Sequence, residues 1–217
     1  MTATLERSSR VDTLRRRIRW IVAATIGYNL IEAVVAISSG VASSSIALVA
    51  FGLDSVVEVL SAAAVAWQFT RKEPERYERP TLRVIAISFF LLAGYVTVSA
   101  VLSLVGAVEP RHSTVGLILT AASVVIMPVL SLIEYRTGRE LGSATAMADS
   151  RQTLICSLLS AAVLLGLALN SLFGWAWADS VAALVIVVFA VREGIEAWRG
   201  DTCATPIGML LDEHEDD

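Results

Sequence analysis

The sequence predicts an all-α, polytopic membrane protein with six transmembrane helices and both termini in the cytoplasm. Three observations support this: 55% of the 217 residues are hydrophobic, they gather in separate blocks, and basic residues cluster between alternate blocks. A block of about 20 residues crosses a hydrocarbon core about 30 Å thick. Such a block must be helical, because a helix satisfies its own backbone hydrogen bonds in lipid. A membrane barrel would instead need alternating segments of about 10 residues, which are absent.

The expected spans follow one another with short connections. They cover residues 18–39, 45–69, 82–108, 115–135, 153–173 and 175–198. The third block is longer than the bilayer requires, so we expect it to tilt or to fray at one end. The chain is accordingly divided into a polar cytoplasmic N-terminal arm (1–17), a six-helix transmembrane domain (18–199) and an acidic cytoplasmic tail (200–217).

Basic residues indicate the orientation of these spans. Arginines and lysines precede the first block, lie between the second and third and between the fourth and fifth, and follow the sixth. The opposite side has only Arg111. Because positively charged loops remain in the cytoplasm, both termini are expected there, in a multi-pass protein of the plasma (inner) membrane.

Composition argues against several classes of protein. The net charge of −4 comes largely from the acidic tail, so it does not indicate a nucleic-acid partner. The first apolar block is too long for a signal peptide. Cys156 and Cys203 do not form a disulfide framework. There is no nucleotide-binding loop, and His112 and His214 lie outside the expected spans, so no prosthetic group and no histidine-based intramembrane centre is predicted.

The second span holds two acids, Asp54 and Glu58, which lie one turn apart on one helix face. An ionised carboxylate at a helix centre costs at least about 2.5 kcal/mol on insertion scales. Two adjacent acids are therefore expected to bind a cation or to share and relay protons. The alternatives are a buried hydrogen-bonded pair, or a helix end that lies nearer the surface.

The fifth span begins with a second polar face, on which Asp149, Gln152 and Cys156 follow in steps of three and four. With the acids of the second span they offer carboxylate, amide and thiol ligands. Oxygen ligands suit hard or borderline cations, and a thiolate shifts the preference toward zinc or cadmium. Cys156 also fits a small buried apolar residue, so both interpretations stay open.

The first span adds Asn29 and Glu32, three residues apart on one face, as accessory positions. Glu32 is expected either to accept hydrogen bonds from neighbouring helices or to line the aqueous entry. Asp179 opens the sixth span, where the helix N-terminus stabilises an acid. Four further charged residues stand near the cytoplasmic ends, where snorkelling or loop pairing explains them; these are Glu134, Arg192, Glu193 and Glu196.

Together these residues resemble the cation diffusion facilitator (cation efflux) family. Residues 50–61 (AFGLDSVVEVLS) follow the pattern of the family's second helix, which implies that Asp54 and Glu58 occupy its two metal-ligand positions, while Phe51 replaces an earlier Asp. Residues 143–156 (SATAMADSRQTLIC) resemble the fifth helix, with Gln152 in place of a His and Cys156 in place of an Asp. The short chain is most similar to a divergent branch without the C-terminal cytoplasmic domain.

The resemblance implies a homodimer that exports a divalent, zinc-like transition-metal cation in exchange for protons, and this is our leading hypothesis. Metal and protons, with the surrounding lipid, would then be its partners, and the protein would not be an enzyme. The alternatives are a metal-binding membrane scaffold or regulator without transport, and a proton-coupled transporter of organic cations. An intramembrane enzyme would need an open coordination position and a substrate path, and the sequence shows no sign of either.

Overall fold

The computed structural model describes the backbone of residues 2–69, 74–106, 109–141 and 144–199. Within these ranges all regular structure is helical, which confirms the predicted all-α class. The helices are α1 (Thr2–Ser43), α2 (Ile46–Phe69), α3 (Pro74–Leu104), α4 (Thr114–Leu141), α5 (Ala144–Phe173) and α6 (Ala176–Arg199). The N-terminal arm is helical and continuous with the first span, and the acidic tail, with Cys203 and His214, lies outside the described residues.

Among the described residues, five helices are long and apolar enough to cross a membrane. The stretches that are long and apolar enough are Arg16–Ser43, Ile46–Ala64, Arg79–Leu104, Thr114–Glu140 and Thr153–Phe173. α6 is 24 residues long, which gives about 36 Å at 1.5 Å per residue. It is not among the five because it carries five charged residues, two of which, Asp179 and Glu193, are buried against other helices.

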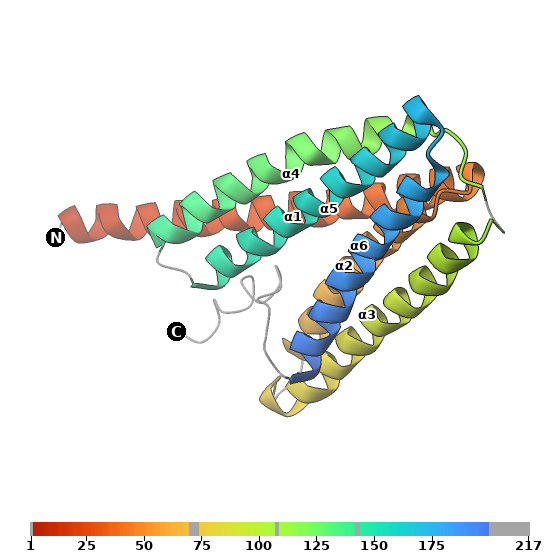
Figure 1. Ribbon diagram of the computed structural model, residues 1–217. Coiled ribbons are helices and arrows are strands. Elements are labelled where there is room, and N and C mark those ends of the chain that lie inside the picture. Colours follow the sequence, from red (N-terminus) through yellow and green to blue (C-terminus); the bar gives the residue numbers. More distant parts are fainter. Residues whose placement is uncertain (1, 70–73, 107–108, 142–143, 200–217) are drawn as a thin grey trace.

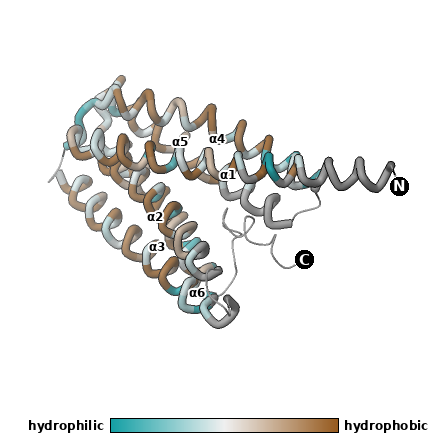
Figure 2. Tube along the Cα trace, turned by 180° about the vertical axis from the view of Figure 1, so that it is seen from behind, coloured by the Kyte–Doolittle hydropathy of each residue, from teal (hydrophilic) through white to brown (hydrophobic). Residues whose placement is uncertain are grey.

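The helices form two groups, α1 with α4 and α5, and α2 with α3 and α6 (Figure 1). The groups lie close together at the end where residues 44–45 and 174–175 connect helices, and they diverge toward the end where α1 begins and α6 ends (Figure 1). Hydrophobic residues cover most of the length of the helices, and more hydrophilic stretches lie near their ends (Figure 2). The site described below lies where α1, α2 and α5 meet.

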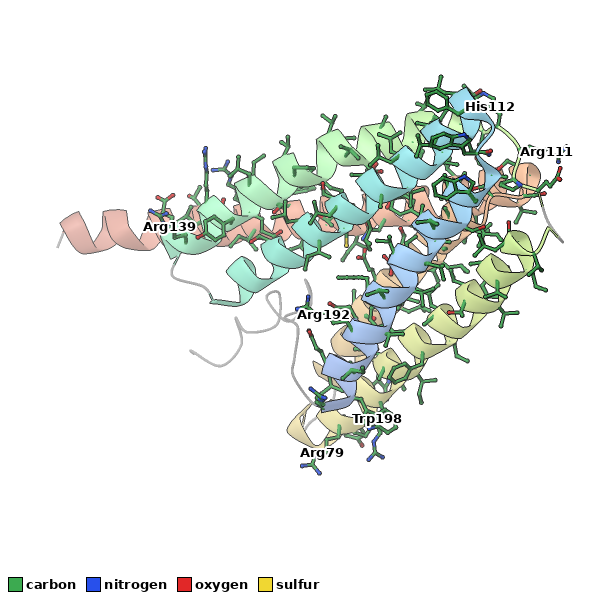
Figure 3. All side chains as sticks on the ribbon, in the orientation of Figure 1. Arg79, Arg111, His112, Arg139, Arg192 and Trp198 are labelled. Carbon is green, nitrogen blue, oxygen red and sulfur yellow. The ribbon has the colours of Figure 1, made fainter. Side chains whose placement is uncertain are left out.

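The described basic side chains differ between the two ends of the molecule. Arg111 lies at the end where the helix groups converge, whereas Arg79, Arg139 and Arg192 lie toward the other (Figure 3). This distribution matches the sidedness expected from the sequence. The assignment of the arginine-rich end to the cytoplasm remains a prediction.

A buried carboxylate fixes α6 against the start of α2. Asp179 is 0% exposed and accepts hydrogen bonds from Ser45 Oγ (2.5 Å), Ile46 N (2.8 Å) and Ala47 N (3.2 Å). The first N–H groups of a helix lack partners within it, so Asp179 satisfies two that would otherwise be buried unpaired. Asp179 lies in the first turn of α6, as the sequence indicated, but the hydrogen bonds it accepts cap the neighbouring α2.

Small residues let α1 and α2 approach each other closely beside the acids. A Cβ added to Gly52 would lie 2.9 Å from Ala36 Cβ and 2.8 Å from a side-chain carbon of Ile37. Close approach of helix backbones at small residues is common in membrane bundles. Here it brings the polar faces of the first two helices together.

Candidate metal centre

Glu58 is the point at which three helices meet through polar side chains. Asn29 Nδ2 of α1 donates a hydrogen bond of 2.6 Å to Glu58 Oε2. The thiol of Cys156, on α5, donates to Glu58 Oε1. Cys156 and Asn29 are buried, whereas Glu58 remains partly accessible. Three residues that the sequence singled out separately therefore lie in direct contact.

Asp54 lies one turn before Glu58 and is only 4% exposed. Its Oδ1 atom has no hydrogen-bond partner among the described residues. The charged groups that act on it most strongly are all acids, namely Glu58, Glu193 and Glu32. A buried carboxylate without a donor and among like charges is costly, and a bound cation would compensate for it.

Hydroxyl groups of neighbouring helices hold the carboxylate of Glu32 on α1. Glu32 is 2% exposed and accepts hydrogen bonds from Ser55 Oγ at 2.9 Å and from Ser123 Oγ. Tyr28 OH lies 2.7 Å from Ser123 Oγ and extends this network to four side chains from α1, α2 and α4. Glu32 therefore belongs to the acidic cluster, but its oxygens are already engaged by hydroxyl donors.

A second acceptor atom near Glu58 also lacks a donor. Asn29 Oδ1 is buried without a hydrogen-bond partner among the described residues. While its amide nitrogen binds Glu58, this oxygen and Asp54 Oδ1 are the two orphaned acceptors beside the acids. Buried orphaned oxygens of this kind are uncommon in proteins and call for an explanation such as an ion.

The remaining expected ligands, Asp149 and Gln152, lie on the same helix as Cys156, because α5 begins at Ala144, well before the expected span. At 1.5 Å per residue, Gln152 is about 6 Å and Asp149 about 10 Å from Cys156 along the axis. Their side chains lie outside the described residues. Among the side chains that are described, no group of three or more His, Cys, Asp or Glu has the geometry to hold a metal ion.

Two acids that the sequence analysis placed at the membrane surface are buried instead. Glu134 is 1% and Glu193 is 6% exposed. Snorkelling is therefore the wrong explanation for both, whereas Arg192 does pair with Glu196, at 2.8 Å near the surface. Helical periodicity was the missed signal. Glu193 continues the buried face of α6, which includes Ala183, Ile186 and Ala190. Glu134 continues the buried face of α4, which includes Ser123, Met127 and Ser131.

Comparison with known proteins gives one matching family model and two relatives. Residues 21–199 match the model of the cation efflux transmembrane domain. The chain is 24% identical over 169 residues to transmembrane protein 163 of Xenopus laevis, covering 74% of this chain and 60% of that protein. It is 29% identical over 86 residues to the cation-efflux pump FieF of Shewanella oneidensis, covering 40% of this chain and 29% of the pump. The chain thus spans less than two thirds of the length of either relative.

Proposed function

Because the chain belongs to the cation efflux family, we propose that it is a secondary active transporter that exports a divalent, zinc-like transition-metal cation in exchange for protons. The observation that carries the proposal is Asp54 Oδ1, a buried carboxylate oxygen without a donor, surrounded by acids and one turn from the Glu58–Cys156 contact. Such a group gains stability from a cation or a proton, and the two would compete for it.

Each side chain of the site has a specific part in this proposal. Asp54 and Glu58 bind the metal cation as it displaces protons from them. Cys156 donates a hydrogen bond to Glu58, so loss of that proton would free both a sulfur and an oxygen ligand at once. Asn29 offers the orphaned Oδ1 atom. Asp149 and Gln152 would complete the site from α5.

The ligand set determines which metals are expected. Carboxylate oxygens alone suit hard cations such as Mg²⁺ and Mn²⁺, and a thiolate favours softer ions. One sulfur among oxygens therefore favours zinc and cadmium over manganese. We further propose that the protein acts as a homodimer in the plasma (inner) membrane, with both termini in the cytoplasm.

The divergence of the two helix groups supports alternating access. Asp54 lies about 12 Å and Glu58 about 18 Å from the start of α2 at the converging end, while toward the other end the groups separate (Figure 1). In this arrangement Glu58 is partly accessible and Asp54 is buried. A second state, in which the groups close at that end and part at the other, would expose the same acids to the opposite side.

The test is metal-driven proton movement in vesicles that contain the purified full chain and a pH-sensitive dye. Zinc, cadmium, cobalt, iron(II) and manganese are added singly. We expect zinc or cadmium to drive proton flux, Asp54→Asn to abolish it, and Glu140→Gln, an exposed acid at the end of α4, to leave it unchanged. Variants must reconstitute as folded protein by size-exclusion chromatography.

Two other outcomes would overturn the proposal. Saturable metal binding without flux would indicate a metal-binding scaffold or regulator. Proton flux driven by organic cations but by none of the metals would indicate an organic-cation transporter that uses the same acids.

A further inference from the structure

Glu193 is a buried acid on α6, a helix to which no role in the site has been assigned. It is 6% exposed, and its charge acts on both Asp54 and Glu58. Its neighbours Arg192 and Glu196 pair with each other nearer the surface. Glu193 therefore differs from these neighbours in being buried.

The contact at Asp179 fixes the height of Glu193 along the bundle. Asp179 binds residues 45–47, so α2 and α6 start at the same level, and they run side by side in the same direction (Figure 1). At 1.5 Å per residue, Asp54 lies about 12 Å from the start of α2 and Glu58 about 18 Å, while Glu193 lies about 21 Å beyond Asp179. Asp54 therefore lies nearest the converging end, Glu58 lies further from it, and Glu193 lies furthest.

The end of α6 beside Glu193 is exposed, although Glu193 itself is only 6% exposed and Asp54 4%. Glu58 is partly accessible, and the side chain of Arg192, next to Glu193, is 67% exposed. Arg192 projects from α6 where the helix groups have separated (Figure 3). A cation that arrives from this end would come under the influence of Glu193 before it reaches Asp54, the acid with the orphaned oxygen.

We propose that Glu193 is a recruiting carboxylate for divalent cations, which binds the arriving metal at the diverging end and passes it to Asp54 and Glu58. The inference rests on the proposed transport function and adds a residue to its path. Carboxylate oxygens are suitable transient ligands for such a cation. A recruiting site raises the local concentration of substrate without taking part in its translocation. Its loss should therefore raise KM and leave kcat largely unchanged.

The experiment compares Glu193→Gln with Glu196→Gln in reconstituted vesicles of the full chain, with zinc alone and cadmium alone. Glu196 is the next acid on α6, three residues further on, and serves as the matched control. We expect Glu193→Gln to raise KM about tenfold with kcat within twofold of wild type, and Glu196→Gln to change neither. An unchanged KM in Glu193→Gln overturns the inference, as does a loss of kcat without a change in KM.

Glu193→Asp separates recruitment from a structural role and also covers poor folding of the Gln variant. It keeps the charge but withdraws it by one methylene, so we expect a KM raised two- to threefold at unchanged kcat. An unchanged KM, or damage equal to that of Gln, contradicts recruitment. If wild type transports and Asp54→Asn does not, a normal Glu193→Gln refutes this inference alone. If wild type moves no metal, the transport function and this inference both fail.

Discussion

The contact between Asp179 and the start of α2 gives a prediction that needs no transport assay. Asp179→Ala removes the acceptor of three buried hydrogen bonds, to Ser45 Oγ, Ile46 N and Ala47 N. Each backbone N–H left unpaired costs about 1–3 kcal/mol, and the lost bond from Ser45 adds about 1 kcal/mol. The free energy of unfolding should therefore fall by about 3–7 kcal/mol, which corresponds to a Tm lower by roughly 6–28 °C at about 2–4 °C per kcal/mol for a chain of this size.

The adjacent residue supplies the control for this measurement. Ser180 is also 0% exposed, but its Oγ has no hydrogen-bond partner among the described residues. Ser180→Ala should therefore leave stability within about 1 kcal/mol of wild type, or raise it. Tryptophan fluorescence in detergent can follow unfolding, since Trp175 and Trp177 stack with ring centroids 5.6 Å apart just before Asp179. Equal shifts of Tm in the two variants would refute the reasoning.

Three further predictions concern the site. Cys156→Ser replaces the sulfur by oxygen, so the affinity for cadmium relative to manganese, measured by isothermal titration calorimetry, should fall about 10- to 100-fold. An unchanged ratio of the two affinities would show that the thiol is not a ligand. Metal affinity should weaken by about tenfold per pH unit for each proton displaced as pH falls, because protons compete with the metal for the acids and the thiol. An affinity independent of pH between 6 and 8 would contradict proton exchange. Gly52→Ala places a Cβ 2.9 Å from Ala36 Cβ, so moving α1 away from α2 should lower the free energy of unfolding by about 1–3 kcal/mol and reduce flux. Gly94→Ala, with nothing within 4 Å, should change neither quantity. Equal effects of the two variants would show that the α1–α2 contact is not tight.

The register of α6 links the stability prediction to the recruitment proposal. If Asp179 sets the level of α6 against α2, its loss should also displace Glu193 from the acids. Asp179→Asn, which keeps one acceptor oxygen, should then raise the KM for metal less than Asp179→Ala does. Equal KM values in folded Asp179→Asn and Asp179→Ala would show that the position of α6 set by Asp179 does not affect metal recruitment by Glu193.

Much of the candidate site could be predicted from the sequence because helical spacing is a local property. Asp54 and Glu58 had to share a face, as did Asn29 and Glu32, wherever their helices packed. The meeting of Asn29, Glu58 and Cys156 was not predictable from spacing alone, since it depends on how α1, α2 and α5 pack. The resemblance to a known family supplied that expectation for α2 and α5.

The errors have a common physical cause. Glu134 and Glu193 were placed by their distance from the expected span ends, which is a measure of depth in the membrane. Their burial depends instead on which face of the helix turns toward its neighbours. The buried faces of α4 and α6 follow the helical period of small, polar and apolar residues, and each acid continues that period.

By itself the sequence determined the membrane class, the helices and the positions of the acids along them. Apolar blocks in lipid must be helical, and a charge inside such a block must have a purpose. Only the tertiary structure decided that Asn29, Glu58 and Cys156 meet, that Asp179 caps α2, and that Glu193 is buried. The reason is that spacing along a helix fixes which side chains share a face, whereas the packing of helices fixes what that face meets.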